Sequence, residues 1–123
     1  MKVLLDTHIL LWWLSGDEAL PQRAAQVIAN PDTVVLVSAA SVWEIAIKKA
    51  VGRLDAPDDL LDALDANAFD ELAITGAHAM AAAELPGHHT DPFDRMLIAQ
   101  TRMEDLTLIS VDGRFAEYEV NLL

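Results

Sequence analysis

Short apolar runs alternate with longer amphipathic stretches along this 123-residue chain. The run Val34–Val37 is rich in β-branched residues and lacks polar alternation, which is typical of a strand buried on both faces of a parallel sheet. Further apolar runs predict strands at residues 3–5, 72–74, 106–110 and 120–123. The stretches between them, with their turn residues, predict helices at residues 9–14, 22–29, 38 or 41 to about 51, 77–85, 92–104 and 115–118, and one more after Pro57.

Strands and helices that alternate through short turns predict an α/β fold. We expect a mainly parallel central sheet of four to five strands flanked by helices. No repeat, low-complexity tract or linker divides residues 1–123, so one domain is expected.

Four acidic residues fall where such a sheet positions a ligand, because the crevice of an open α/β sheet lies beyond the carboxyl ends of its strands. Asp6 ends the first predicted strand, Glu44 lies early in the helix after the second, and Asp112 follows the strand at 106–110. Asp94 lies in the first turn of the helix before that strand. Hard oxygen ligands of this kind suit Mg²⁺ or Mn²⁺, so the pattern indicates metal-assisted phosphoryl transfer.

Two of these acids have local explanations as helix caps. Asp6 or Thr7 can cap the helix that follows the first strand. Ser41 and Glu44 match the spacing of a capping box, in which Glu44 would accept only a backbone N–H hydrogen bond.

The other two acids have local explanations as well. Asp91 precedes Pro92 and is best interpreted as a cap, which leaves Asp94 in a first turn where the helix dipole favours any carboxylate. Asp112 and Gly113 form a turn dipeptide. None of these explanations predicts that several acids meet at one sheet edge. Clustered carboxylates raise each other's pKa unless a cation neutralises them, so the convergence favours a metal site.

The histidines and tryptophans carry weaker signals. His88 and His89 lie in a loop beside Asp91, but adjacent side chains seldom converge on one ion, so we do not expect them to form a metal site. The tryptophans lie in apolar helical patterns and are predicted as core or interface anchors rather than base-stacking platforms: Trp12, Trp13 and Trp43.

The composition narrows the function further. The formal charge is −12, which argues against non-specific binding to phosphate backbones and confines any nucleic-acid role to a local site. The absence of cysteine excludes thiolate chemistry and, with no signal-peptide pattern after Lys2, favours the cytoplasm. The longest strictly apolar run, residues 9–14, is too short for a membrane span, so no membrane partner is expected.

Four segments together resemble a known family. They are Leu4-Leu5-Asp6-Thr7-His8, Ser41-Val42-Trp43-Glu44-Ile45-Ala46-Ile47-Lys48, Asp91-Pro92-Phe93-Asp94-Arg95-Met96-Leu97-Ile98-Ala99-Gln100 and Leu108-Ile109-Ser110-Val111-Asp112. In this order and spacing the chain resembles the PIN-domain family, and within it the VapC-type toxins of toxin–antitoxin pairs. The likeness covers nearly the whole chain.

The resemblance implies a three-layer PIN-like domain with Mg²⁺- or Mn²⁺-dependent endoribonuclease activity, a homodimer, and inhibition by a VapB-type antitoxin. It assigns the catalytic and metal-binding roles to Asp6, Glu44, Asp94 and Asp112. Accessory positions near the metal match Thr7 and Ser110, while Asp91 is less securely part of the site. RNA as substrate follows from the family, because attack by water does not select RNA over DNA.

The predicted mechanism is hydrolysis of a phosphodiester by a metal-activated water. The cations available to contact substrate are Lys48, Lys49, Arg53, Arg95 and Arg114, although a surface role is open for each. A catalytically silent interaction module with the same acids stays open as the alternative.

Overall fold

The computed structural model describes residues 1–123 and contains one five-stranded parallel sheet with the strand order β3-β2-β1-β4-β5. The strands are β1 (Lys2–Leu5), β2 (Val34–Ser38), β3 (Asp70–Leu72), β4 (Thr107–Ile109) and β5 (Asn121–Leu122). The predicted α/β class with a parallel central sheet is therefore confirmed.

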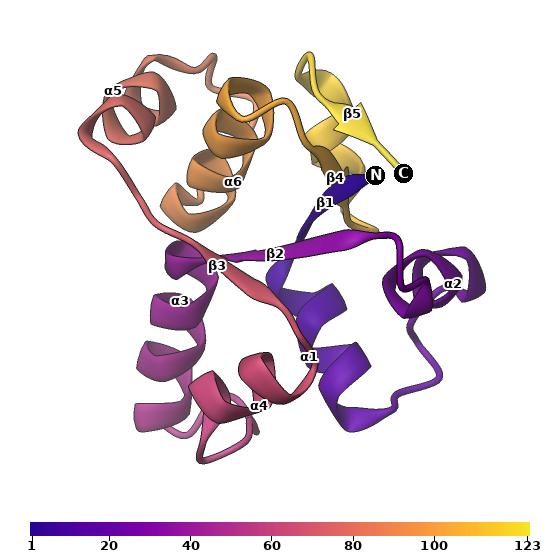
Figure 1. Cartoon of the computed structure of the whole chain (residues 1–123). Coiled ribbons are helices and arrows are strands. Elements are labelled where there is room, and N and C mark those ends of the chain that lie inside the picture. The colour runs from indigo at the N-terminus through magenta and orange to yellow at the C-terminus, as the bar shows by residue number, and fades with distance from the viewer.

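Helices cover both faces of the sheet and produce three layers (Figure 1). Helices α5 (Gly76–Glu84) and α6 (Pro92–Met103) lie on one face together with the 3₁₀ helix η1 (Gly113–Glu117). The opposite face carries α1 (Thr7–Ser15), α2 (Gln22–Ala29), α3 (Ala39–Ala50) and α4 (Leu60–Ala66). None of these helices combines the length and the apolar character that spanning a bilayer requires.

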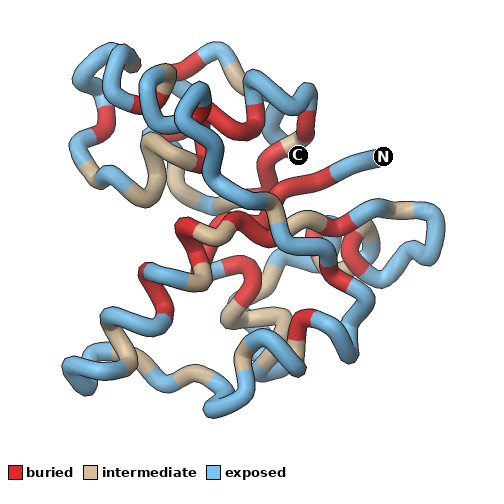
Figure 2. Tube along the Cα trace, turned by 60° about the vertical axis from the view of Figure 1, so that its left-hand side comes forward, coloured by how far each residue is buried: buried red, intermediate tan, exposed pale blue.

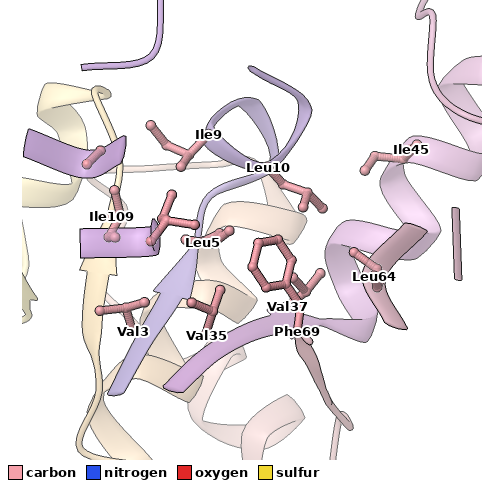
Figure 3. Packing of buried hydrophobic residues seen from close by; sticks show 12 residues of the cluster. Val3, Leu5, Ile9, Leu10, Val35, Val37, Ile45, Leu64, Phe69 and Ile109 are labelled. Carbon is pink, nitrogen blue, oxygen red and sulfur yellow. The ribbon is translucent and has the colours of Figure 1, made fainter. Parts of the chain in front are cut away.

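The central strand β1 supplies apolar side chains to both layers. Val3 and Leu5 belong to the larger core cluster, which includes Val35 and Val37 from β2 (Figure 3). Leu4 belongs to the second cluster, under α6 and η1. Buried segments therefore concentrate along the middle of the sheet, whereas the outer helices are mostly exposed (Figure 2). A strand buried on both faces provides a rigid base for the residues at its carboxyl end.

Several element boundaries differ from the predicted ones. Helix α3 begins at Ala39 because the Ser38 hydroxyl caps it, accepting a hydrogen bond from the Ala40 N–H at 3.0 Å. The capping-box interpretation of Ser41 and Glu44 is therefore wrong, since both residues lie inside the helix. The predicted strand at residues 72–74 forms instead at Asp70–Leu72.

The tryptophans divide between core and surface. Trp12 and Trp13 are partly buried and pack against the larger core cluster. Trp43 is 61% exposed on α3 and contacts Phe93 edge-to-face, with 5.4 Å between ring centroids. Trp43 is thus the only tryptophan that the fold leaves largely free to contact another molecule.

Candidate active site

The structure brings the four predicted acids together at the carboxyl edge of the sheet. Asp6 directly follows β1, and Asp112 lies three residues after the end of neighbouring β4. Glu44 comes from α3 and Asp94 from the first turn of α6. Burial raises the pKa of Asp94, and the negative charges of Asp6, Asp91, Glu44 and Asp112 raise it further, as expected for carboxylates gathered at one edge of the sheet.

Asp6 is held by two short hydrogen bonds. Its Oδ1 accepts the Thr7 N–H at 2.7 Å, so Asp6 caps α1, and its Oδ2 accepts the Ser110 hydroxyl at 2.7 Å. Burial nevertheless raises the pKa of Asp6, because the loss of water outweighs the hydrogen bond from Ser110. The predicted cap and the predicted site residue are therefore the same carboxyl group.

Thr7 connects Asp6 to Glu44. Its hydroxyl donates to Glu44 Oε1 at 2.7 Å and lies 3.1 Å from the Ser41 hydroxyl. The other oxygen of Glu44 pairs with Lys48 Nζ at 2.5 Å, and that hydrogen bond raises the pKa of Lys48. Glu44 is 5% exposed, so a hydroxyl and an ammonium group offset the burial of its charge.

Asp91 caps α6, as predicted. Its Oδ1 accepts the N–H groups of Phe93 and Asp94 at 2.8 and 3.2 Å, and Pro92 occupies the first helical turn. No hydrogen bond in the structure involves the second oxygen, Oδ2. Asp91 therefore has a structural role and still adds negative charge beside Asp94.

Asp94 is the most electrostatically strained of the acids. Burial, followed by the charges of its acidic neighbours, raises its pKa to about 7. No side-chain hydroxyl or ammonium group donates a hydrogen bond to its carboxylate. Asp112 shows the opposite effect, because hydrogen bonds from the Arg114 guanidinium lower its pKa.

His89 was not expected to belong to this site. It is 1% exposed, and its Nε2 lies 2.8 Å from Asp94 Oδ2 and 3.7 Å from Asp112 Oδ2. His88 points elsewhere, with Nδ1 3.8 Å from Glu117 Oε2, so the two histidines do not converge. The only sequence signal for His89 is its position two residues before the α6 cap.

The predicted substrate-binding cations lie in different places. Lys48 and Arg114 each contact a site carboxylate, and Arg53 is exposed beyond the end of α3. Lys49 instead bonds the Ala56 carbonyl and Asp58 on the side facing α4.

Arg95 has a different role from the one that the sequence suggests. Its guanidinium donates to carbonyl oxygens at the end of α5 and in the following loop, including Leu85 at 2.7 Å and His89 at 2.9 Å. These bonds tie the α5 end and the His89 loop to α6. Because the carbonyl groups occupy the guanidinium, the structure does not support Arg95 as a substrate contact.

The residues present fit a divalent cation. The donor set is dominated by carboxylate oxygens, and carboxylate oxygens of Asp94 and Asp112 lie within 4.8 Å of each other. Burial and then the charges of its acidic neighbours raise the pKa of Asp94, and no side-chain hydroxyl or ammonium group donates to its carboxylate. A bound cation of the Mg²⁺ or Mn²⁺ type would offset this negative charge.

Comparisons with known proteins identify the family of this chain. The PIN domain family model matches residues 3–121. Ribonuclease VapC22 of Mycobacterium tuberculosis is 29% identical over 119 residues, which cover 94% of this chain and 91% of that protein.

Two solved structures show the same fold at low sequence identity. VapBC2 from Rickettsia felis, bound to a DNA fragment from its promoter, superposes with a TM-score of 0.73 at 13% identity, over 100% of this chain and 98% of the other. FitAcB from Neisseria gonorrhoeae superposes with a TM-score of 0.67 at 19% identity, over 98% and 96%.

Proposed function

This chain belongs to the PIN domain family, and we propose that it is a divalent-metal-dependent endoribonuclease toxin that a partner antitoxin inhibits. The observation that carries the proposal is the convergence of the four carboxylates of Asp6, Glu44, Asp94 and Asp112. The ribonuclease name of the VapC22 relative supports RNA as the substrate. We place the activity in the cytoplasm, as the absence of cysteine predicts.

The same four acids would hold Mg²⁺ or Mn²⁺, which when bound lowers the pKa of a water molecule and neutralises charge on phosphoryl oxygens. Thr7 orients the Glu44 carboxylate and Ser110 orients the Asp6 carboxylate through their hydroxyl hydrogen bonds. Fixed side chains of this kind lower the reorganisation needed during the reaction.

We propose Lys48 and Arg114 as the groups that contact the phosphate backbone beside the scissile bond. Both already lie against site carboxylates, and both are partly or largely exposed, with side-chain exposures of 39% and 59%. Arg53 is a more distant candidate at the end of α3. We do not propose Lys49 and Arg95 for this role, because Lys49 pairs with Asp58 on the side facing α4 and Arg95 donates to backbone carbonyls.

The direct test is cleavage of a labelled RNA by purified, antitoxin-free protein with Mg²⁺ or Mn²⁺, with and without a chelator. We expect cleavage that the chelator abolishes and that Asp6→Asn removes, since Asn keeps an oxygen to cap α1 while deleting the charge. The matched control is Asp17→Asn, at an exposed turn carboxylate that accepts the Ala19 N–H.

Two outcomes would contradict the activity. Cleavage that persists in the chelator would refute the metal requirement. A folded protein that binds an antitoxin but cleaves no RNA with either metal would favour the silent interaction module.

We further propose that the antitoxin lies in the groove between α3 and α4. The groove has a volume of about 740 Å³, combines apolar residues such as Ile45 and Leu60 with carboxylates, and lies on the helix that carries Glu44. Its acidic residues are Asp58, Asp59 and Asp62. These charges favour a partner that presents an apolar face with Lys or Arg.

Adding the antitoxin should suppress RNA cleavage, and Leu61→Asp should weaken its binding without changing the fold of the free protein, since Leu61 is 57% exposed in the groove. A partner that binds with unchanged affinity to this variant would refute the location. A partner that binds while cleavage continues would refute inhibition.

A homodimer is the second assembly that we propose. Three exposed apolar residues follow one another at intervals of one helical turn along α3 and past its end: Trp43, Ile47 and Val51, at 61%, 41% and 63% exposure. Stripes of this kind mark association surfaces. Sedimentation at micromolar concentration should give about twice the 13.4 kDa monomer mass, and Trp43→Glu should give a monomer. A wild-type monomer would show that the stripe does not mediate self-association.

A further inference from the structure

The least explained polar group near the site is the imidazole of His89. His89 lies in the loop between α5 and α6, and its side chain is buried between Asp94 and Phe115. Its Nε2 lies 2.8 Å from Asp94 Oδ2, yet the alignment does not complete a hydrogen bond, and this buried nitrogen has no other partner. Buried polar atoms without a partner are rare and point to an interaction that the resting geometry leaves incomplete.

The contact made by the other ring nitrogen, Nδ1, indicates which nitrogen of His89 carries the proton. The Asp91 N–H donates to His89 Nδ1 at 3.3 Å, so Nδ1 presents a lone pair. A neutral ring with a lone pair on Nδ1 carries its proton on Nε2. This hydrogen-bond network thus assigns an N–H group that faces the acids.

The polarity of these contacts argues against direct metal ligation by His89. To bind a metal through Nε2, a neutral imidazole must carry its proton on Nδ1, and ligating histidines donate that proton to an acceptor. At His89, Nδ1 faces the Asp91 N–H, which is itself a donor. Direct ligation through Nε2 would place a proton on His89 Nδ1, where it would face the N–H of Asp91, so that two donors would point at each other.

The backbone of the His89 loop is fixed independently of the site. The His89 N–H donates to the Tyr118 hydroxyl at 2.8 Å, and the Tyr118 hydroxyl donates to the Pro86 carbonyl at 2.6 Å. The His89 carbonyl accepts from the Arg95 guanidinium at 2.9 Å. A loop held at both its N–H and its carbonyl presents the imidazole in one orientation.

On these grounds, and resting on the proposed metal-dependent function, we propose that His89 is a positioning residue: its Nε2–H donates to the Asp94 carboxylate and holds it beside Asp112 for metal binding. Donors of this kind outside the ligand set orient ligating carboxylates, and their loss commonly weakens metal affinity about 10- to 100-fold. Of the four acids, Asp94 is the one for which the fold provides no other side-chain donor.

Histidine NMR of the wild-type protein tests the donor assignment without any activity. Two-bond ¹H–¹⁵N correlation spectra at pH 8 should show His89 as the Nε2–H tautomer, both without metal and with saturating Mg²⁺. An Nδ1–H tautomer, or loss of the Nε2 proton when Mg²⁺ binds, would overturn the proposal.

Two substitutions separate the ring nitrogens. His89→Gln places an amide N–H near the position of Nε2, whereas His89→Asn retains an acceptor near Nδ1 and loses the donor. We expect Mn²⁺ affinity, measured by electron paramagnetic resonance of free Mn²⁺, to fall about 10-fold or more in His89→Asn and to stay within about 3-fold of wild type in His89→Gln. His88→Gln and His88→Asn are the matched controls and should both bind as wild type.

Thermal unfolding of each variant establishes that the protein measured is folded. Equal Mn²⁺ affinity in both His89 variants, whether unchanged or equally weakened, would overturn the positioning role. If wild-type protein binds no divalent ion, the proposed metal-dependent function fails, and the proposed role of His89 fails with it. If wild-type protein binds metal and cleaves RNA but His89 is the wrong tautomer, only the present inference fails.

Discussion

The two halves of the acidic site differ in how their charge is compensated. On the β1 and α3 side, Asp6 accepts the Ser110 hydroxyl, and Glu44 accepts both the Thr7 hydroxyl and Lys48. On the α6 side, Asp94 has only the misaligned His89 nitrogen near its carboxylate, and its pKa rises to about 7. Side-chain hydroxyl and ammonium groups donate to the carboxylates of the first half, whereas no such group donates to Asp94 in the second half.

The difference follows from where the elements begin. Ser110 directly follows β4 and Thr7 lies two residues after the end of the neighbouring β1, so their hydroxyls lie at one sheet edge beside Asp6. Asp94 projects from the first turn of α6, where the helix dipole and the Asp91 cap fix its backbone but provide no side-chain donor. The site thus combines a half whose carboxylates accept hydrogen bonds from side-chain donors with a half in which Asp94 lacks such a donor, and we propose that metal binding completes the second half.

The largest effect should come from removing the uncompensated charge. Asp94→Asn should reduce metal-dependent RNA cleavage about 100-fold or more, because it deletes a metal ligand. Single-turnover cleavage at saturating Mn²⁺ measures the change. Wild-type turnover in this variant would contradict the assignment of Asp94 to the metal site.

The same substitution should stabilise the metal-free protein. The pKa of Asp94 is raised from 3.8 to about 7 by folding, so the unfolded chain loses this proton first as the pH rises. The stability that the protonated Asp94 carboxyl group gives the folded state is therefore lost as the pH rises from 4 to 7. Asp94→Asn should raise the unfolding midpoint at pH 8 in EDTA by about 4 °C, corresponding to roughly 1 kcal/mol, and should have a much smaller effect at pH 4. An unfolding midpoint below that of wild type at pH 8 would show that the carboxylate is not strained.

A smaller effect is expected in the compensated half. Thr7→Val removes the hydroxyl that orients Glu44, and we expect cleavage to fall about 10-fold. Thr7→Ser keeps the hydroxyl and should retain most of the activity. Wild-type activity in Thr7→Val together with a loss in Thr7→Ser would indicate that the methyl group, rather than the hydrogen bond, matters.

The smallest effect concerns the cap of α6. Asp91→Asn retains an oxygen for the Phe93 and Asp94 N–H groups and should keep activity within about 3-fold. It also removes one of the charges that raise the pKa of Asp94, so the pH profile should move toward lower pH. Cleavage rates measured from pH 5.5 to 8.5 test both statements. Activity as low as that of Asp94→Asn would make Asp91 a metal ligand.

The strand and helix order could be predicted because buried parallel strands appear as short apolar runs, as Val34–Val37 does. The places of Asp6, Glu44 and Asp112 at one sheet edge could be predicted because these residues follow such strands, whereas Asp94 lies at the start of the helix before one of them. The first residue of α3 could not be predicted, because Ser38 and Ser41 both match a capping pattern and only packing selects Ser38.

The roles of Arg95 and His89 depend on contacts between distant segments. The Arg95 guanidinium bonds carbonyls of α5, and the His89 imidazole is enclosed by residues from α6 and η1. Neither contact produces a periodic pattern in the sequence. The sequence alone therefore suggests that Arg95 contacts substrate and that His89 is a loop residue outside the site.

The most direct test of the central claim is the number of protons that Mn²⁺ displaces on binding. Calorimetric titrations in buffers of different ionisation enthalpy give this number at each pH. Because the pKa of Asp94 is about 7, Mn²⁺ binding should release close to one proton at pH 5.5 and almost none at pH 8.5. The absence of Mn²⁺ binding, or a proton release that is the same at both pH values, would contradict an acidic site that metal binding completes.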